Sequence, residues 1–194
     1  MTIQQPVPDY AAARQAMVDS QLRPEGVNDP LVVQAMAGVA REQFVPEENR
    51  ALAYLDRSVP VGKDRSLAPP VATGLLLTAM ALRPGERALV VGAATGYSAA
   101  VLAAMGLDVT AIDGADASGG PYDAILIEGA VEQVPETIID QLKDGGRIGY
   151  SALDRGISRL TVGRKSGGAL GLRTIADSIV ASLAGSRRPR AFTF

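Results

Sequence analysis

The sequence predicts an α/β fold with a mostly parallel sheet, helices on both faces and an antiparallel hairpin near the carboxyl end. Apolar runs alternate with helix-like segments in the second half of the chain, which is the pattern of a parallel sheet. Residues 159–177, "RLTVGRKSGGALGLRTIAD", hold two strand-like runs around "SGG", which is typical of a hairpin. The length of 194 residues favours a single domain, 1–194, made of a helical segment (1–82) and a sheet-bearing core (83–194).

The first part of the chain is expected to be helical. Three helices are predicted, at residues 10–22, 30–40 and 70–82. The first is rich in alanine and can place Met17 and Leu22 on one inner stripe. Asn28 or Asp29 can cap the second, with Pro30 in its first turn. The segment between the second and third helices is punctuated by proline and reads as irregular, with one helical turn near 47–51.

The second part of the chain supplies the sheet. Strands are predicted at 87–92, 108–113, 122–129 and 147–153, and helices at 95–106 and 134–146. The run "RALVVG" is apolar without interruption, as a strand buried on both faces should be. Gly106 is well placed to end the helix before the second strand.

Composition excludes several kinds of chemistry. The chain has no cysteine and no histidine, so disulfides, thiolate catalysis, Cys/His zinc sites and Ser-His triads are excluded, and no metal site is expected. A net charge of −2 argues against extended electrostatic binding of nucleic acid. The basic stretch at 185–190 is interpreted as a solvated tail segment. No signal-peptide pattern and no membrane span are visible, so we expect a cytoplasmic protein.

The stretch "LVVGAATGYS" is the first candidate for a binding site. A strand ends, Gly92 and Gly96 bracket a turn of small residues that includes Ala94, and a helix begins with its free N–H groups toward the crevice. The full glycine pattern of dinucleotide folds and the G-K-[ST] of phosphate loops are both absent. The turn fits either a cofactor or simple tight packing of strand against helix.

Two acids at strand ends favour the cofactor. Asp113 closes the strand about twenty residues after the turn, where a carboxylate can accept both hydroxyls of a ribose, although it could also be a solvated cap. Glu128 ends the next strand and could meet a cofactor ammonium or be solvated. Tyr97 could pack beside the ligand or on the sheet. Because a pyrophosphate-type glycine triplet is missing, S-adenosylmethionine fits better than NAD.

The chain resembles the protein-L-isoaspartate O-methyltransferase family, in a divergent bacterial branch. Four stretches carry the resemblance: "MVDSQLRPEGVNDPLVVQAMAGVAREQFVPE", "AYLDRSVPVG", "LRPGERALVVGAATGYSAAVLA" and "VPETIIDQLKDGGRI". The resemblance implies a Rossmann-like class I methyltransferase sheet. It also implies methyl transfer from S-adenosylmethionine, giving S-adenosylhomocysteine, to the α-carboxylate of isoaspartyl residues in damaged proteins. These proteins are then the expected partners, while the oligomeric state stays unknown.

The chain departs from the family at several site positions. The family's acceptor loop "GQTIS" aligns with "DRSLA", so that its serine falls on Ala68 and its threonine on Ser66; these two are the catalytic candidates that the resemblance implies. In the family's "EIGTGSGY" the acid falls on Val90 and the middle glycine on Ala94. A catalytically degenerate relative, acting as a binding or scaffold module, is therefore the alternative to an enzyme.

The largest departure lies between the second and third predicted strands. Only residues 114–121 connect them, whereas a parallel crossover usually needs a dozen residues or more. Eight extended residues reach roughly 26 Å, which is barely enough to return along a strand. The resemblance implies a further helix and strand in this gap. Either the fold is pruned here, or a segment is absent from the sequence.

Overall fold

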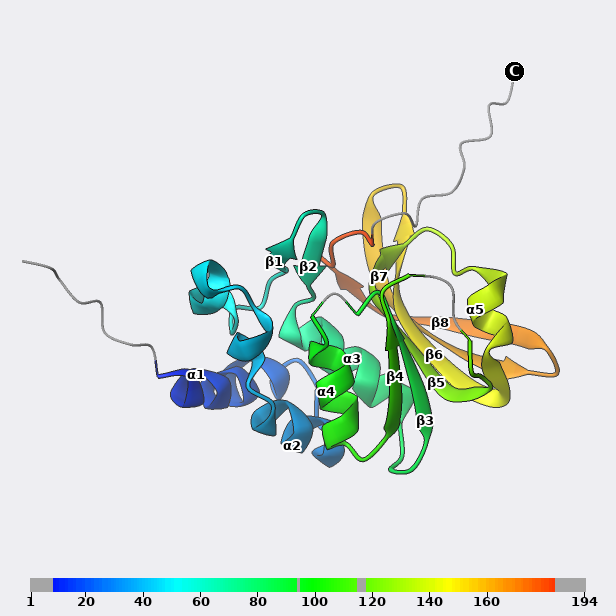
Figure 1. Cartoon of the computed structure of the whole chain (residues 1–194), viewed down its shortest axis with the longest axis horizontal. Helices are drawn as coiled ribbons and strands as arrows, with labels where there is room; N and C mark the ends of the chain where they lie inside the picture. Colours follow the sequence, from blue (N-terminus) through cyan, green and yellow to red (C-terminus); the bar gives the residue numbers. More distant parts are fainter. Residues whose placement is uncertain (1–8, 94, 115–117, 184–194) are drawn as a thin grey trace, which may run out of the picture.

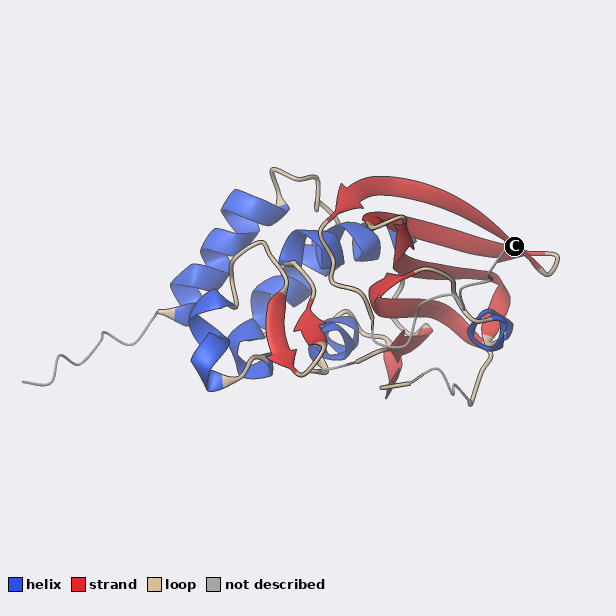
Figure 2. Cartoon of the chain, turned by 90° about the horizontal axis from the view of Figure 1, so that it is seen from above, coloured by secondary structure: helices blue, strands red, loops and turns tan. Residues whose placement is uncertain are grey.

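The computed structural model of the chain describes residues 9–93, 95–114 and 118–183. A six-stranded sheet lies on one side of the molecule and a group of helices on the other (Figures 1 and 2). The strand order is β4-β3-β5-β6-β7-β8. β3, β4, β5 and β6 run parallel to one another, and β7 and β8 are antiparallel additions. The predicted fold class is confirmed.

The three helices of the first part begin at the residues predicted from the sequence, Tyr10, Pro30 and Pro70. The segments are α1 (Tyr10–Met17), a π-helical turn (Val18–Leu22), α2 (Pro30–Gly38), 3-10 turns at Arg41–Phe44 and Glu47–Leu52, and α3 (Pro70–Met80). Asp29 caps α2, since its carboxylate accepts from the backbone N–H groups of Leu31 and Val32. Met17 and Leu22 are fully buried, as the inner stripe of the first helix predicts.

The core elements follow the predicted alternation. They are β3 (Arg87–Val91), α4 (Tyr97–Ala104), β4 (Asp108–Ile112), β5 (Tyr122–Val131), α5 (Glu136–Asp140), β6 (Leu142–Asp154), β7 (Ile157–Ser166) and β8 (Ala169–Ser178). The last two strands form the expected hairpin, whose turn lies at Gly167 and Gly168, both with a positive φ.

Two predictions about local structure are wrong. The helix predicted at 134–146 ends at Asp140, and Leu142 already pairs with Tyr122 of β5. The stretch between α2 and α3, expected to lack strands, contains a hairpin of β1 (Val59–Gly62) and β2 (Arg65–Leu67). In both places a short segment is ordered by pairing with a neighbouring strand, which local periodicity does not record.

β4 is the edge strand of the sheet, as the short connection at 114–121 implies. Among the described residues of this connection there is no helix and no strand. The chain therefore lacks, in the part that is described, the additional edge strand expected from the resemblance.

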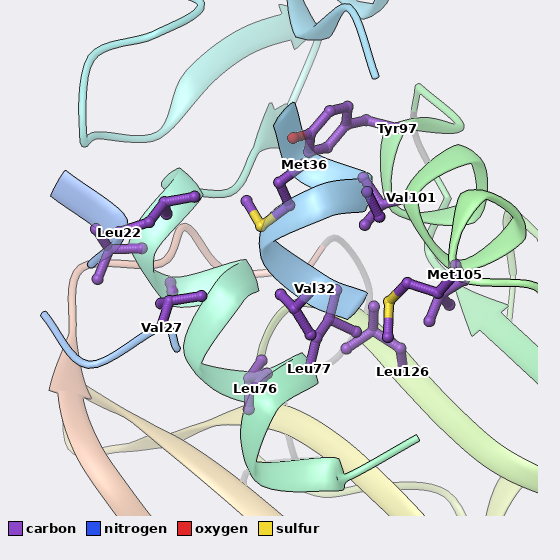
Figure 3. Close-up of a cluster of buried hydrophobic side chains, with 14 of the residues drawn as sticks. Leu22, Val27, Val32, Met36, Leu76, Leu77, Tyr97, Val101, Met105 and Leu126 are labelled. Carbon is purple, nitrogen blue, oxygen red and sulfur yellow. The ribbon is translucent and has the colours of Figure 1, made fainter. Parts of the chain in front are cut away.

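The sheet separates two apolar clusters. The larger joins α1, α2, α3 and α4 to one face of the sheet; Figure 3 shows its centre, with Met36, Leu77 and Val101 packed between helices. The smaller lies on the opposite face, where Ile138 of α5 packs with Ile125 and Ile148. Helices thus cover both faces of the sheet, as predicted.

Candidate functional site

A cavity of about 150 Å³ lies where the strands β3, β4 and β5 end. We call it the strand-end cavity. Its lining residues come from five separate parts of the chain: Asp64, Arg65, Ser66, Gly92, Asp113, Glu128, Gly129, Ala181, Ser182 and Leu183. Crevices outside the carboxyl ends of parallel strands are where open α/β sheets bind ligands.

Gly92 forms the floor of the cavity because the chain turns sharply there. Its φ is +76°, and its N–H donates to the carbonyl of Ile112, as does that of Ala93. A Cβ at this position would lie 3.0 Å from the carbonyl oxygen of Glu128 and 2.7 Å from a methyl carbon of Leu183. Both the conformation and the close approach require glycine.

Asp113 lies directly after β4 and forms an ion pair across the cavity. Its Oδ2 accepts from Nη2 of Arg65 at 2.6 Å. Arg65 begins β2, so the β1–β2 hairpin brings a cation from far back in the sequence to the end of the sheet. The two side chains are 45% and 58% exposed, so solvent screens the pair and its contribution to stability is small.

Glu128 lies at the inner side of the cavity, on β5. Its carboxylate accepts a short hydrogen bond from the hydroxyl of Ser98 on α4. Burial raises the pKa of this carboxyl. The hydrogen bonds from Ser98 and the charge of Arg41 act to lower the pKa, but the effect of burial is larger. The interpretation of Glu128 as a simple solvated acid is therefore wrong, while its side chain does reach the predicted crevice.

The end of the described chain enters the same cavity. Ala181 accepts from the N–H of Ala130 at 2.9 Å, and Leu183 donates to the carbonyl of Ala130 at 2.9 Å, so the segment 181–183 runs beside the end of β5. The side chain of Leu183 covers Gly92. Figure 1 shows this last part of the described chain in red, passing close to the β1–β2 hairpin.

Ala68, which directly follows β2, does not line the strand-end cavity. It lines a small hollow of about 20 Å³ together with Ser98, and Glu128 lines both spaces. The carbonyl of Ala68 accepts a hydrogen bond from Nη2 of Arg41, whose Nε donates to the carbonyl of Ala53 at 2.6 Å. Arg41 is fully buried, and these two bonds tie the loop before α3 to the first part of the chain.

Tyr97 stands in the core rather than at the cavity. Its ring is fully buried beneath the Arg41 guanidinium, 4.7 Å from the ring centroid, and meets Phe44 edge-on at 5.6 Å. Figure 3 shows the ring pointing toward α2. The packing interpretation of this side chain is the one that the structure supports.

The structure brings together four of the predicted site residues: Ser66, Gly92, Asp113 and Glu128. Gly96, with φ +82°, precedes α4 but is not among the lining residues, and Ala94 lies outside the described residues. Val90 is buried inside β3. Arg65 and Leu183 also line the cavity, and neither is among the residues predicted from the sequence.

Within the described ranges, no three acidic, histidine or cysteine side chains are grouped so that they could share a metal ion. In the same ranges, none of the helices combines the length and apolarity needed to cross a membrane.

Comparison with known families gives one match. The sequence model of the protein-L-isoaspartate(D-aspartate) O-methyltransferase family matches residues 12–116 and 107–169. The two matched segments overlap at 107–116, at the short β4–β5 connection, whose described residues form no helix and no strand.

Individual relatives agree with this match. A protein-L-isoaspartate O-methyltransferase of Methylorubrum extorquens (strain PA1) is 39% identical over 175 residues, covering 76% of this chain and 77% of its own. One from Methylorubrum populi is 39% identical over 165 residues, covering 71% and 78%.

Solved structures agree in fold. A Plasmodium falciparum protein described as a putative protein-L-isoaspartate O-methyltransferase, in complex with S-adenosyl-L-homocysteine, superposes with a TM-score of 0.75 at 18% identity, covering 88% of this chain and 97% of its own. A second protein-L-isoaspartate O-methyltransferase gives a TM-score of 0.75 at 21% identity, covering 89% and 66%. At this level of identity the likeness shows the fold alone.

Proposed function

This chain belongs to the protein-L-isoaspartate(D-aspartate) O-methyltransferase family, and we propose that it transfers the methyl group of S-adenosylmethionine to the carboxylate of isoaspartyl residues in proteins. One observation carries the proposal: Ser66, Gly92 and Asp113, predicted from the sequence, line one cavity together with Glu128. No finding favours the non-catalytic alternative. A cytoplasmic location stays a prediction.

The residues present fit the cofactor. Gly92 has no Cβ, so a ligand can approach its backbone once the side chain of Leu183 moves away. Asp113 offers a carboxylate that can accept two ribose hydroxyls, and Glu128 offers an acceptor for an ammonium group. The roles of Ala94, Gly96 and Tyr97 at the cofactor stay predictions; for Tyr97 only the backbone lies near the turn.

The cavity must enlarge to take the whole cofactor. Sites for small molecules usually measure about 300–1,000 Å³, which exceeds the 150 Å³ found here. Since the side chain of Leu183 lies against Gly92, we infer that the segment 181–183 shifts when the cofactor binds.

Arg65 links the cofactor to the acceptor. While it pairs with Asp113, the carboxylate proposed for the ribose is occupied. If the ribose hydroxyls take its place on Asp113, the guanidinium is released beside Ser66 and can attract the acceptor carboxylate. Cofactor binding would then precede acceptor binding.

The reaction needs little acid–base help from the chain. The bound cofactor supplies an activated methyl group on a sulfonium. The acceptor is already an anion, so the tasks left to the protein are to align the two and to exclude water. The absence of histidine is consistent with this chemistry.

Two measurements test the proposal. Calorimetry with S-adenosylhomocysteine should give a dissociation constant on the order of 1–10 μM. Transfer of labelled methyl groups from S-adenosylmethionine should occur to an isoaspartyl peptide and not to the same peptide with normal aspartate. Binding weaker than about 1 mM would overturn the cofactor site. Tight binding without methylation of the isoaspartyl peptide would overturn only the acceptor.

A further inference from the structure

A second concave site lies at the opposite end of the sheet. We call it the arginine groove: it measures about 440 Å³ and contains Arg83, Arg147, Arg164 and Arg173. These residues come from the turn after α3 and from β6, β7 and β8. The groove shares no lining residue with the strand-end cavity. The two sites lie at opposite ends of β3: Glu86 of the groove directly precedes this strand, and Gly92 of the cavity directly follows it.

Strand register explains why three arginines face the same way. Arg147 of β6 pairs directly with Arg164 of β7, and Arg173 of β8 pairs with Val162, two residues along the same face. Like charges directly opposite each other across a ladder are destabilising. Gly171 lies opposite Arg164 on the other side, so no side chain fills the floor between Arg164 and Arg173.

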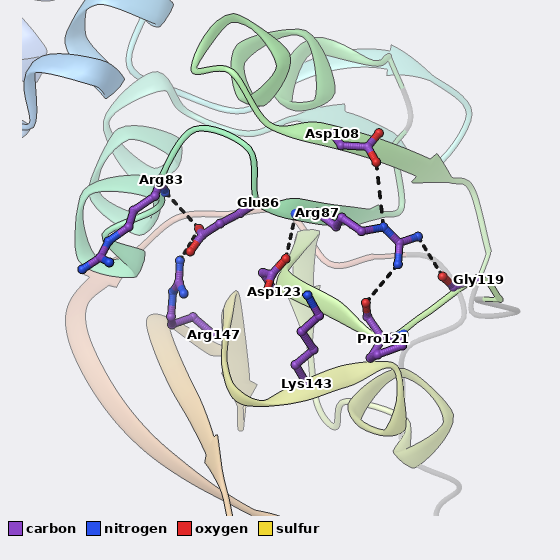
Figure 4. Close-up of polar contacts among 9 residues, drawn as sticks. All are labelled: Arg83, Glu86, Arg87, Asp108, Gly119, Pro121, Asp123, Lys143 and Arg147. Atoms are coloured by element: carbon purple, nitrogen blue, oxygen red, sulfur yellow. Dashed lines mark hydrogen bonds and ion pairs between the residues drawn. The ribbon is translucent and has the colours of Figure 1, made fainter.

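The positive charge in the groove is not balanced by the protein. Glu86 is the carboxylate among the lining residues, and it already binds Arg147 and accepts from the backbone N–H of Arg83 at 2.9 Å. Figure 4 shows both contacts, with the Arg83 side chain pointing away from Glu86. Within the described parts of the chain, no ion pair or hydrogen bond engages the guanidinium groups of Arg83, Arg164 and Arg173.

We propose that the arginine groove binds a compact polyanion that carries two or more phosphate groups. A guanidinium presents two parallel donors that match phosphate oxygens, and its charge does not depend on pH near neutrality. The groove falls within the size range of small-molecule sites. Its arginines converge on one hollow from several elements, whereas an extended nucleic acid needs a stripe of positive charge.

The test uses the full chain and inorganic triphosphate as the probe, by calorimetry in about 0.15 M salt. We expect saturable binding of one triphosphate per chain. The double variant R164Q/R173Q should weaken it by about tenfold or more, as loss of charged hydrogen bonds predicts. The matched control R50Q removes an exposed arginine from outside the groove and should change binding by less than about twofold. Glu86→Gln should strengthen binding, because it frees Arg147.

Further ligands identify the source of the phosphates. Equal affinity for triphosphate and ATP assigns the groove to the phosphate chain alone, and tighter binding of ATP assigns it to a nucleotide; either supports the proposal. No saturable binding up to about 1 mM would overturn it. Equal weakening by R50Q and R164Q/R173Q, or preferential binding of a single-stranded oligonucleotide or an acidic peptide, would do the same.

Discussion

The two sides of the strand-end cavity are built in different ways. On the inner side, Gly92 and Glu128 extend from β3 and β5, which lie inside the sheet and between the two apolar clusters. On the outer side, Asp113 follows the edge strand β4 and is held by one exposed ion pair to Arg65. The inner side is therefore fixed by packing, while the outer side depends on contacts that solvent and ligands can replace.

The outer side of the cavity is also where the chain departs from the pattern of its family. The short connection at 114–121 leaves β4 without a further strand on its outer side in the part that is described. The glycine turn follows β3, which has a strand on each side, whereas Asp113 follows β4, which has a described neighbour on one side only. Substitutions on the two sides should accordingly affect different properties: stability on the inner side, ligand affinity on the outer.

The largest effect is expected at Arg41, behind the inner side. Arg41→Met keeps much of the volume but leaves the buried carbonyls of Ala53 and Ala68 without donors. We expect a loss of about 2–4 kcal/mol in the free energy of unfolding, measured in urea. Arg23→Met, which removes an exposed arginine paired with Asp19, should cost less than about 0.5 kcal/mol. Equal effects in the two variants would contradict the anchoring role.

Asp113→Ala tests the outer side. It should weaken S-adenosylhomocysteine binding by about 1.5–3 kcal/mol, because a charged acceptor is lost. The free energy of unfolding should change by less than about 1 kcal/mol. Asp108→Ala is the matched control, since Asp108 begins the same strand and also faces an arginine, Arg87, at 3.8 Å. A dissociation constant that does not move would remove Asp113 from the site.

Leu183→Ala tests whether the end of the described chain competes with the ligand. Shortening this side chain clears the space above Gly92 and should tighten S-adenosylhomocysteine binding by about three- to tenfold. Ile179→Ala shortens a side chain of the same segment that is 89% exposed, and should leave the affinity unchanged. Weaker binding in Leu183→Ala would mean instead that the side chain of Leu183 contacts the bound ligand and forms part of its binding site.

The fold was predictable because its signals are local. Uninterrupted apolar runs marked β3 and β5, and Asp29 with Pro30 marked the start of α2. Leu142 falls within the helix predicted at 134–146, yet its backbone pairs with Tyr122 of β5. Pairing between segments distant in sequence leaves no periodicity to read.

The site was predictable only where strand ends define it. Gly92, Asp113 and Glu128 lie there because parallel strands bring their carboxyl ends to one edge. Arg65 and Leu183 reach the same cavity through a hairpin and through the end of the described chain, and no local pattern encodes either approach. Tyr97 follows the turn in sequence, but the helical geometry of α4 points its ring into the core.

Glu128→Gln should reveal how the burial of an ionisable carboxyl on the inner side changes the free energy of unfolding. The folded state raises the pKa of this carboxyl through burial, so between its ordinary value of 4.5 and the raised value the folded chain holds a proton that the unfolded chain has released. The stability of the wild-type protein must therefore fall as the pH rises through this window.

The glutamine variant has no such proton to lose and can still accept from Ser98. It should be more stable than the wild type at pH 7, by on the order of 1 kcal/mol, and the difference should vanish near pH 4. Urea denaturation at several pH values measures both. A glutamine variant that is less stable at pH 7 would show that the charged form is favoured in the folded state.

The smallest effect is expected at Ala68, where the resemblance places the serine of the acceptor loop. Ala68 lines a small hollow of about 20 Å³, enough for roughly one water, and is not among the residues that line the strand-end cavity. A hydroxyl there would meet Ser98 and Glu128 rather than the acceptor, so Ala68→Ser should leave kcat/KM for an isoaspartyl peptide within about threefold. Ser66→Ala, whose side chain does line the strand-end cavity, should lower it more. A tenfold gain from Ala68→Ser would place the acceptor against α3, and the outer side of the cavity would then serve the cofactor alone.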